Sequence, residues 1–252
     1  MSWWEEIFDE LYISVFSGFD EERNLWEVER IVEILNLPQD SKILDLCCGY
    51  GRHSIPLAER GYDMTGLDLS KAFLKKAKRD AKERNVKIRW SRSDMREIPF
   101  EDEFDAVINI FTSFGFFEKE EEDFKVLKKV NRCLKQGGKF LLDTINREYV
   151  IRNFQARDWD MIDKNTFVLD ERKLDLNKNR IYTKNIFLSK SGREERSFSV
   201  RLYTLSEMTG MLRKANLEVR NVFGSFNQTE YTIDSERMII LAKAIRKTKD
   251  IS

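Results

Sequence analysis

The 252-residue sequence is poor in proline, cysteine and histidine and has no long apolar run. Its three cysteines are an odd number without CxxC spacing, so neither a disulfide framework nor a zinc site is indicated. Apolar runs such as Met238–Ala242 are far shorter than the roughly 20 residues of a membrane-spanning helix. The first residues are acidic and lack the basic and apolar regions of a secretory signal. We therefore expect a cytoplasmic protein with reduced thiols.

Charge is balanced overall, with 44 Lys and Arg against 44 Asp and Glu, and 41% of the residues are hydrophobic, as in a folded enzyme-sized chain. The balance hides an asymmetry, because residues 1–40 hold eleven acids and two bases and so form an acidic, helical region. The basic excess elsewhere lies mainly in one helical segment, residues 71–84. Without a basic stripe, the pattern argues against nucleic acid as the main partner.

Strand-like and helix-like segments alternate along the first part of the chain. The expected strands are residues 42–47, 63–67, 86–90, 104–111 and 139–145, and the expected helices between them are 52–60, 70–85 and 120–134. Because parallel strands need crossover connections, this alternation predicts a doubly wound, mainly parallel α/β sheet.

The pattern changes after Asn146. Extended stretches at 166–176, 180–189 and 197–204 predict an antiparallel meander, and a helix at 206–215 with strands at 217–223 and 238–244 completes a seven-stranded first sheet. We expect three parts: an acidic cap (1–40), a Rossmann-like core (41–146 with 204–252) and an inserted antiparallel β subdomain (147–203) over the active site.

A glycine-rich turn follows the first strand, and an acid, Asp68, ends the second, which together indicate a nucleoside-cofactor site. Gly49 and Gly51 are followed by Ser54 where a dinucleotide fingerprint has its third glycine. Asp45, beside the turn, would repel a pyrophosphate but suits an ammonium group, which S-adenosylmethionine carries.

At these residues the chain resembles the class I S-adenosylmethionine-dependent methyltransferases, over residues 43–244. Asp45, Gly49 and Gly51 match the first motif of that family, and Cys47 stands in place of its first glycine. The resemblance implies that Asp68 binds the ribose hydroxyls. It also implies that Asp94 accepts from the adenine amine and that the Met95 amide faces the ring. The cofactor-binding residues predicted in this way are Tyr12, Asp45, Cys47, Gly49, Gly51, Arg52, Asp68, Leu69, Asp94, Met95 and Asn109.

His53, the only histidine, lies beside the cofactor loop and is the candidate catalytic base. A purely hydrogen-bonding role towards the cofactor or the backbone is the alternative. Trp4, Phe8 and Tyr12 share one helical face, which suits either a lid over the cofactor or ordinary packing.

The acceptor pocket is expected beyond the carboxyl ends of the strands, bordered by Phe111, Ser113, Phe114 and Asn146. The chain has no Pro-Pro and no Pro-Cys, the motifs that this superfamily associates with base amines and with cytosine C5. The edge is apolar and hydroxyl-bearing, so no metal is expected.

The sequence thus predicts a methyltransferase that moves a methyl group from S-adenosylmethionine to an amine or hydroxyl of a small molecule or peptide by in-line displacement, leaving S-adenosylhomocysteine. With one histidine, an amine is favoured. A nicotinamide-dependent oxidoreductase and a non-catalytic cofactor-binding module of the same fold stay open, as does a homodimer paired through the meander. An RNA or protein substrate is opposed only by the charge balance.

Overall fold

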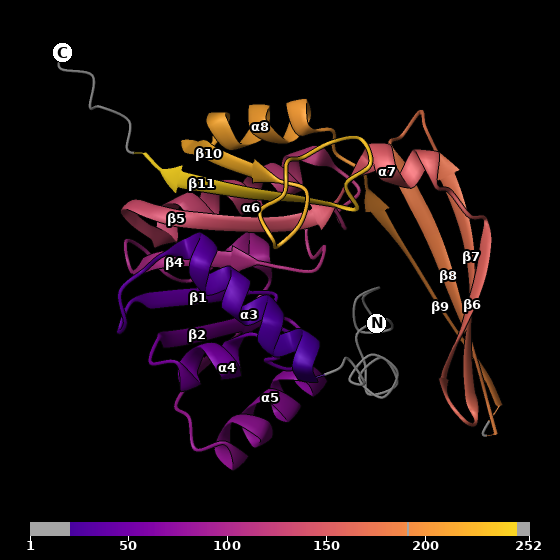
Figure 1. Cartoon of the computed structure of the whole chain (residues 1–252), viewed down its shortest axis with the longest axis horizontal. Helices are drawn as coiled ribbons and strands as arrows, with labels where there is room; N and C mark the ends of the chain where they lie inside the picture. The colour runs from indigo at the N-terminus through magenta and orange to yellow at the C-terminus, as the bar shows by residue number, and fades with distance from the viewer. Residues whose placement is uncertain (1–20, 191, 246–252) are drawn as a thin grey trace.

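A computed structural model describes residues 21–190 and 192–245, so the aromatic face of Trp4, Phe8 and Tyr12 lies outside the described residues. Figure 1 shows a large sheet and a second sheet that stands across one end of it. The large sheet has the order β10-β11-β5-β4-β1-β2-β3, and only β11 runs antiparallel to its neighbours. Its strands are β1 (Lys42–Leu46), β2 (Asp63–Asp68), β3 (Arg89–Arg92), β4 (Phe104–Asn109), β5 (Leu134–Ile145), β10 (Leu217–Phe223) and β11 (Arg237–Ala244). The predicted doubly wound α/β sheet is confirmed.

Helices cover both faces of the large sheet. They are α3 (Glu21–Leu35), α4 (Ser54–Glu59), α5 (Lys71–Glu83), α6 (Glu120–Cys133) and α8 (Leu205–Lys214). A short helix, α7 (Arg147–Arg152), and a 3-10 turn, η1 (Met95–Glu97), have no buried residue. Consecutive residues of a strand point to opposite faces, so Val107 packs in the cluster that contains α6 and α8, whereas Ile108 packs in the cluster that contains α3 and α4. This double burial explains why the central strands read as continuous apolar runs.

Two helices of the large sheet, α5 and α8, start at capping residues that the sequence supplies. The Ser70 hydroxyl accepts from the Phe73 amide at 3.2 Å and begins α5 directly after β2. Thr204 and Glu207 form a reciprocal capping box at the start of α8. These caps satisfy amides that would otherwise lack partners, and so they fix where the chain leaves each strand end.

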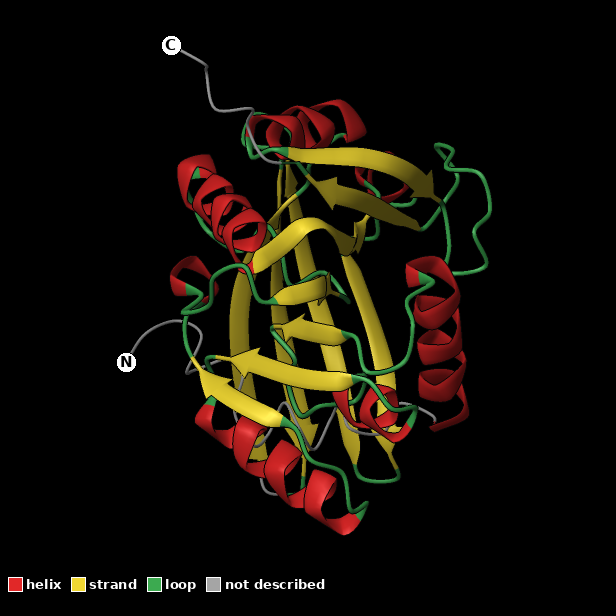
Figure 2. Ribbon diagram, turned by 90° about the vertical axis from the view of Figure 1, so that its left-hand side faces the viewer, coloured by secondary structure: helices red, strands yellow, loops and turns green. Residues whose placement is uncertain are grey.

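The second sheet is an antiparallel meander of β6 (Arg157–Asp163), β7 (Thr166–Asp175), β8 (Arg180–Ser189) and β9 (Gly192–Arg201), in that order. In Figure 2 its long strands cross the direction of the strands of the large sheet. The sequence predicted three of these strands. It missed β6, in which acidic residues at 158, 160 and 163 disguise the strand.

Two further differences concern element ends, and a third is an additional helix. β3 begins at Arg89 instead of Val86, because residues 86–88 follow the end of α5 without pairing. β5 begins at Leu134, directly after α6, instead of at Lys139. The short helix α7 was not predicted. Among residues 21–190 and 192–245, no helix combines the length and the hydropathy that a bilayer crossing requires.

Candidate functional site

The turn after β1 carries three residues in the left-handed region: Cys47 at φ 62°, Gly49 at φ 57° and Gly51 at φ 83°. Glycine adopts this conformation without steric cost, whereas Cys47 is an uncommon non-glycine example. The amide of Gly49 donates to Asp68 Oδ2 at 2.9 Å and so ties the turn to the end of β2. The chain therefore turns sharply at the carboxyl end of β1 and presents its backbone to the adjoining cavity.

Three carboxylates lie at or just after the ends of β1, β2 and β3. Asp45 accepts from the Ser54 hydroxyl at 2.6 Å, and burial raises its pKa to about 7. Asp68 accepts from the amides of Gly49 and Ser70, and burial raises its pKa as well. Burial also acts to raise the pKa of Asp94, but hydrogen bonds from Arg96 outweigh it and lower the pKa. The group suits a cationic ligand with hydrogen-bond donors.

A cavity of about 580 Å³ lies between these strand ends and the second sheet. It brings together most of the residues that the sequence singled out. Those that line it are Asp45, Cys47, Gly49, Arg52, His53, Asp68, Leu69, Asp94, Met95, Phe111 and Ser113.

Four of the predicted residues do not line the cavity. Gly51 lies behind the turn, where a Cβ would come within 2.9 Å of the Trp90 ring. Asn109 is buried and donates to the Leu46 carbonyl at 2.8 Å. Phe114 is 1% exposed, and its ring packs on Tyr203 in the core.

The fourth, Asn146, is fully buried and acts as the cap of α7. Its side-chain oxygen accepts from the Glu148 amide at 3.0 Å, and its amide group donates to the carbonyls of Thr232 and Ser235. Through these bonds the Asn146 side chain holds the segment before β11 against the start of α7. Tyr12 lies outside the described residues.

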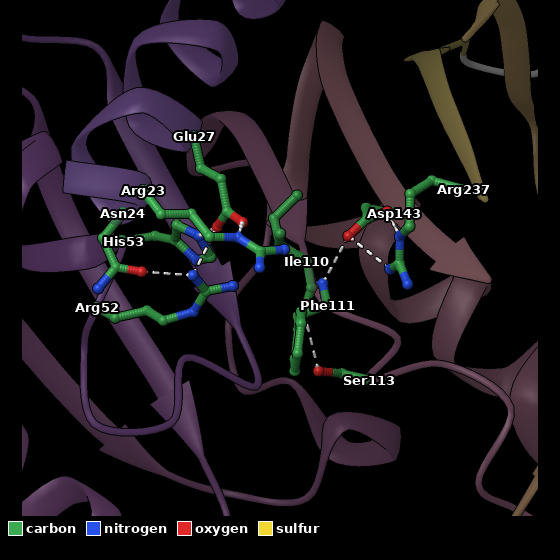
Figure 3. Close-up of polar contacts among 10 residues, drawn as sticks. All are labelled: Arg23, Asn24, Glu27, Arg52, His53, Ile110, Phe111, Ser113, Asp143 and Arg237. Atoms are coloured by element: carbon green, nitrogen blue, oxygen red, sulfur yellow. Dashed lines mark hydrogen bonds and ion pairs between the residues drawn. The ribbon is translucent and has the colours of Figure 1, made fainter. Parts of the chain in front are cut away.

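A buried cluster from α3 and the first turn surrounds His53. Glu27 accepts from Arg52 Nη1 at 2.6 Å and lies 3.0 Å from His53 Nε2, so we assign Nε2 as the protonated nitrogen (Figure 3). Burial would raise the pKa of Glu27, but the bonds and charges of His53 and Arg52 lower it to about 2. Burial and the charge of Arg52 lower the pKa of His53 to about 4, which leaves the imidazole neutral at pH 7.

The loop after β4 is held in an unusual conformation. Phe111 and Thr112 both have positive φ, 66° and 58°, which costs free energy for non-glycine residues. Asp143 on β5 restrains both, since its carboxylate accepts from the Phe111 amide at 2.8 Å and its carbonyl from the Thr112 amide at 3.1 Å. Arg237 on β11 pairs with Asp143 (Figure 3). It also donates to the Thr112 hydroxyl at 2.9 Å. Arg52 lies over the Phe111 ring, 5.0 Å from its centre.

The second sheet forms the opposite wall of the cavity with one face of its strands. Asp170 accepts from Asn185 at 2.5 Å and pairs with Arg172, and Phe198 packs on Phe116 from the loop after β4. The residues of the sheet that line the cavity are Asp170, Arg172, Ile181, Thr183, Asn185, Phe198 and Val200. They alternate along the strands, as one face of a sheet must.

Sequence reasoning expected an inserted sheet over the site but missed Glu27, Asp143, Arg237 and the residues with which this sheet lines the cavity. Asp143 interrupts an apolar strand and Arg237 precedes one, which is the signal that was available for both. Over the described ranges 21–190 and 192–245, no cluster of three or more His, Cys, Asp or Glu side chains is arranged to hold a metal ion.

Comparison with known proteins shows which family the chain resembles. Residues 43–138 match a family described as a methyltransferase domain. The chain is 30% identical over 209 residues to the cypemycin N-terminal methyltransferase of a Streptomyces species, covering 81% of this chain and 84% of that protein.

Solved structures show the same fold. The CcbJ methyltransferase from Streptomyces caelestis aligns with a TM-score of 0.83 at 17% identity and covers 96% of this chain and 99% of its own. An S-adenosylmethionine-dependent methyltransferase from Clostridium acetobutylicum ATCC 824 aligns with a TM-score of 0.79 at 19% identity, covering 94% and 97%. The family match and the 30% identical relative favour the methyltransferase over the oxidoreductase alternative.

Proposed function

This chain belongs to the S-adenosylmethionine-dependent methyltransferases, and from that premise we propose that it methylates an amine of a small molecule or a peptide. The cofactor supplies an activated methyl group on a sulfonium, so that orientation matters more than acid–base chemistry. The division into an acidic cap (1–40), a core (41–146 and 204–252) and an inserted subdomain (147–203) is part of the proposal. A homodimer and the exclusion of nucleic acid stay predictions.

In this proposal the carboxylate half of the cavity holds S-adenosylmethionine. Asp45 pairs with the ammonium group, which offsets the cost of burying a carboxylate whose pKa is raised to about 7. Asp68 is fixed by two backbone amides and accepts from the ribose hydroxyls with its remaining lone pairs. Asp94 and Met95, just after β3, hold the adenine. These residues therefore fit the cofactor of the family.

The observation that carries the choice of an amine is the pairing of His53 with Glu27. With Nε2 donating to Glu27, the other ring nitrogen, Nδ1, is an acceptor, and it has no hydrogen-bond partner among the described residues. The carboxylate thus fixes the tautomer and the ring orientation, as orienting carboxylates do in other imidazole sites. His53 lines the cavity, so Nδ1 is proposed to accept from the N–H of a neutral amine.

A pKa of about 4 makes His53 a poor base for a hydroxyl, because an effective base has a pKa near the working pH. A neutral amine already carries a reactive lone pair and needs only alignment, and its surplus proton leaves from the product ammonium to solvent. The relative named as an N-terminal methyltransferase supports nitrogen as the acceptor atom.

The test is methyl transfer from S-adenosylmethionine to matched pairs, such as phenethylamine and 2-phenylethanol, followed by mass spectrometry. We expect methylation of amines only. Alcohols methylated in preference to amines would contradict the proposal. Calorimetry with S-adenosylmethionine, S-adenosylhomocysteine and NADH provides the cofactor control, with binding expected for the first two alone.

The His53 arrangement has its own matched pair of variants. Glu27→Gln leaves Arg52 buried without its carboxylate and should destabilise the fold by roughly 3–5 kcal/mol, because an uncompensated buried charge is costly. Glu29→Gln, on the same helix, removes an exposed carboxylate 3.8 Å from Arg60 and should cost less than about 1 kcal/mol. Urea unfolding measures the loss of stability in both variants. Equal losses would contradict the assignment of Glu27 to the site.

A further inference from the structure

Arg237 places a guanidinium group in the acceptor half of the cavity. It is the first residue of β11, opposite Ile145 of β5, and both residues line the cavity. Its side chain is 23% exposed, so the aliphatic stem is largely enclosed while the head reaches the cavity. Neither the cofactor motifs nor the proposed role of His53 uses this cation.

The ion pair with Asp143 leaves one edge of this guanidinium available. Nε and Nη2 each lie 2.8 Å from the Asp143 carboxylate, which is a side-on, bidentate pair. The third nitrogen, Nη1, lies away from the carboxylate in Figure 3 and has no partner within residues 21–190 and 192–245. A guanidinium has five N–H donors in a fixed fork, so Nη1 still offers two.

A hydroxyl adjoins that free edge. Nη2 uses one hydrogen for Asp143 and directs the other to the Thr112 hydroxyl at 2.9 Å, which places this hydroxyl at the end of the guanidinium next to Nη1. The Thr112 oxygen accepts there, so its own hydrogen is left to donate. Nη1 and the Thr112 hydroxyl therefore form a corner of N–H and O–H donors that faces the cavity.

This corner is rigid before any ligand arrives. Asp143 is buried and also accepts from the Phe111 amide, so the carboxylate that holds Arg237 is itself fixed. A donor that is already immobilised loses little conformational entropy on binding. Arg172 differs from Arg237, since it pairs with both Asp170 and Asp158. Arg52 is held in the His53 cluster by Glu27 and Asn24.

We propose that Arg237 Nη1 and the Thr112 hydroxyl bind a carboxylate of the methyl acceptor, which then carries an amine and a carboxylate on the same molecule. The corner holds a single guanidinium that is already shared with Asp143, and this matches a monoanion better than a phosphate dianion. That the methyl acceptor has an amine rests on the proposed function. That it also has a carboxylate is inferred from the corner at Arg237.

The experiment titrates the full-length protein, saturated with S-adenosylhomocysteine, with phenylacetate and its neutral isostere phenylacetamide. We expect phenylacetate to bind about tenfold more tightly, as suits one charge-assisted contact. The double variant Asp143→Asn/Arg237→Gln removes both charges of the pair and should abolish that preference while S-adenosylhomocysteine still binds. Thr112→Val keeps the ion pair and should reduce the preference to a few-fold. Arg220→Gln, on the exposed surface of β10, is the matched control.

Equal affinities for the two probes in the wild type, or no binding of either at millimolar concentration, would overturn the carboxylate corner. A preference that survives the double variant would overturn it too. Methylation of phenethylamine against phenylalanine separates the two proposals. If neither amine is methylated while phenylacetate still binds through Arg237, the amine fails and the corner stands. If both amines are methylated equally well, the corner fails and the amine stands.

Discussion

The two halves of the cavity are built in different ways. The cofactor half uses residues that follow consecutive strands, β1 to β3, within a single stretch of the chain from Asp45 to Met95. The acceptor half is assembled from His53, from the loop after β4, from β5, from β11 and from the second sheet, so that Asp143 meets Arg237 across 94 residues. The first half is therefore a local motif, and the second is a product of the tertiary fold.

The contrast matches what each half has to do. A cofactor common to many enzymes is bound by a turn and three strand ends that any parallel sheet brings to one edge. The acceptor differs from enzyme to enzyme, and loops and insertions on a conserved scaffold are where such differences are placed. We expect substitutions in the first half to act on S-adenosylmethionine and substitutions in the second to act on the acceptor.

The largest effect is expected for Asp68→Ala. This change removes the proposed ribose acceptor together with the bonds from the Gly49 and Ser70 amides. Each hydrogen bond to a charged group is worth about 1.5–3 kcal/mol, so the affinity for S-adenosylmethionine should fall by at least about 100-fold in calorimetry. If the folded variant binds S-adenosylmethionine with unchanged affinity, the assignment of the cofactor to this half of the cavity is wrong. Asp63→Ala, an exposed acid at the other end of β2, is the control.

How far the sequence predicts the molecule follows the same division. Asp45 and Asp68 were identified from their places beside the glycine-rich turn and at the end of the second strand, and Asp94 from the resemblance to the methyltransferase motifs. The seven-stranded sheet was predicted because strand-like and helix-like patterns can be recognised within short stretches of the sequence. β6 was not predicted, because aspartate is disfavoured in strands and residues 157–161 are exposed, so that only the pairing with β7 makes this segment a strand.

The acceptor half shows where local reasoning fails. Phe114 and Asn146 follow strands and were expected in the pocket, yet both are buried. The chain reverses at Phe111 and Thr112, two left-handed residues without glycine, and no propensity predicts that conformation. Asn146 is drawn inward by carbonyls some 86 residues later in the chain. Such placements follow from contacts that only the folded chain makes.

An intermediate effect is expected from pH, through Asp45. Its folded-state pKa of about 7 lies above the ordinary 3.8, so the neutral form is favoured in the cofactor-free protein. The stability that this group contributes is present below pH 4 and is lost as the pH rises towards 7. Pairing with an ammonium group needs the ionised form, so the affinity for S-adenosylmethionine should increase up to about tenfold per unit between pH 5.5 and 7.

Asp45→Asn should flatten both dependences, measured by calorimetry and by urea unfolding across that range. Burial also raises the pKa of Asp123 to about 7, so this residue titrates in the same pH range. Because Asp123 is present in both proteins, the difference between the variant and the wild type reports on Asp45. A wild-type affinity that is constant with pH would mean that Asp45 does not face the ammonium group. An affinity that falls as the pH rises would assign that role to another residue.

The smallest effect tests the border between the halves. Phe111 is 41% exposed and lies under Arg52, a residue of the first turn, yet its backbone is held by Asp143 of the acceptor half. Phe111→Leu keeps an apolar side chain and loses a cation–π contact worth about 0.5–1 kcal/mol at such an exposed site. If Phe111 belongs to the acceptor half, the Kd of S-adenosylmethionine should stay within about twofold while the acceptor KM rises a few-fold. A change in cofactor affinity alone would move the border, because Phe111 would then act through Arg52 on the first half.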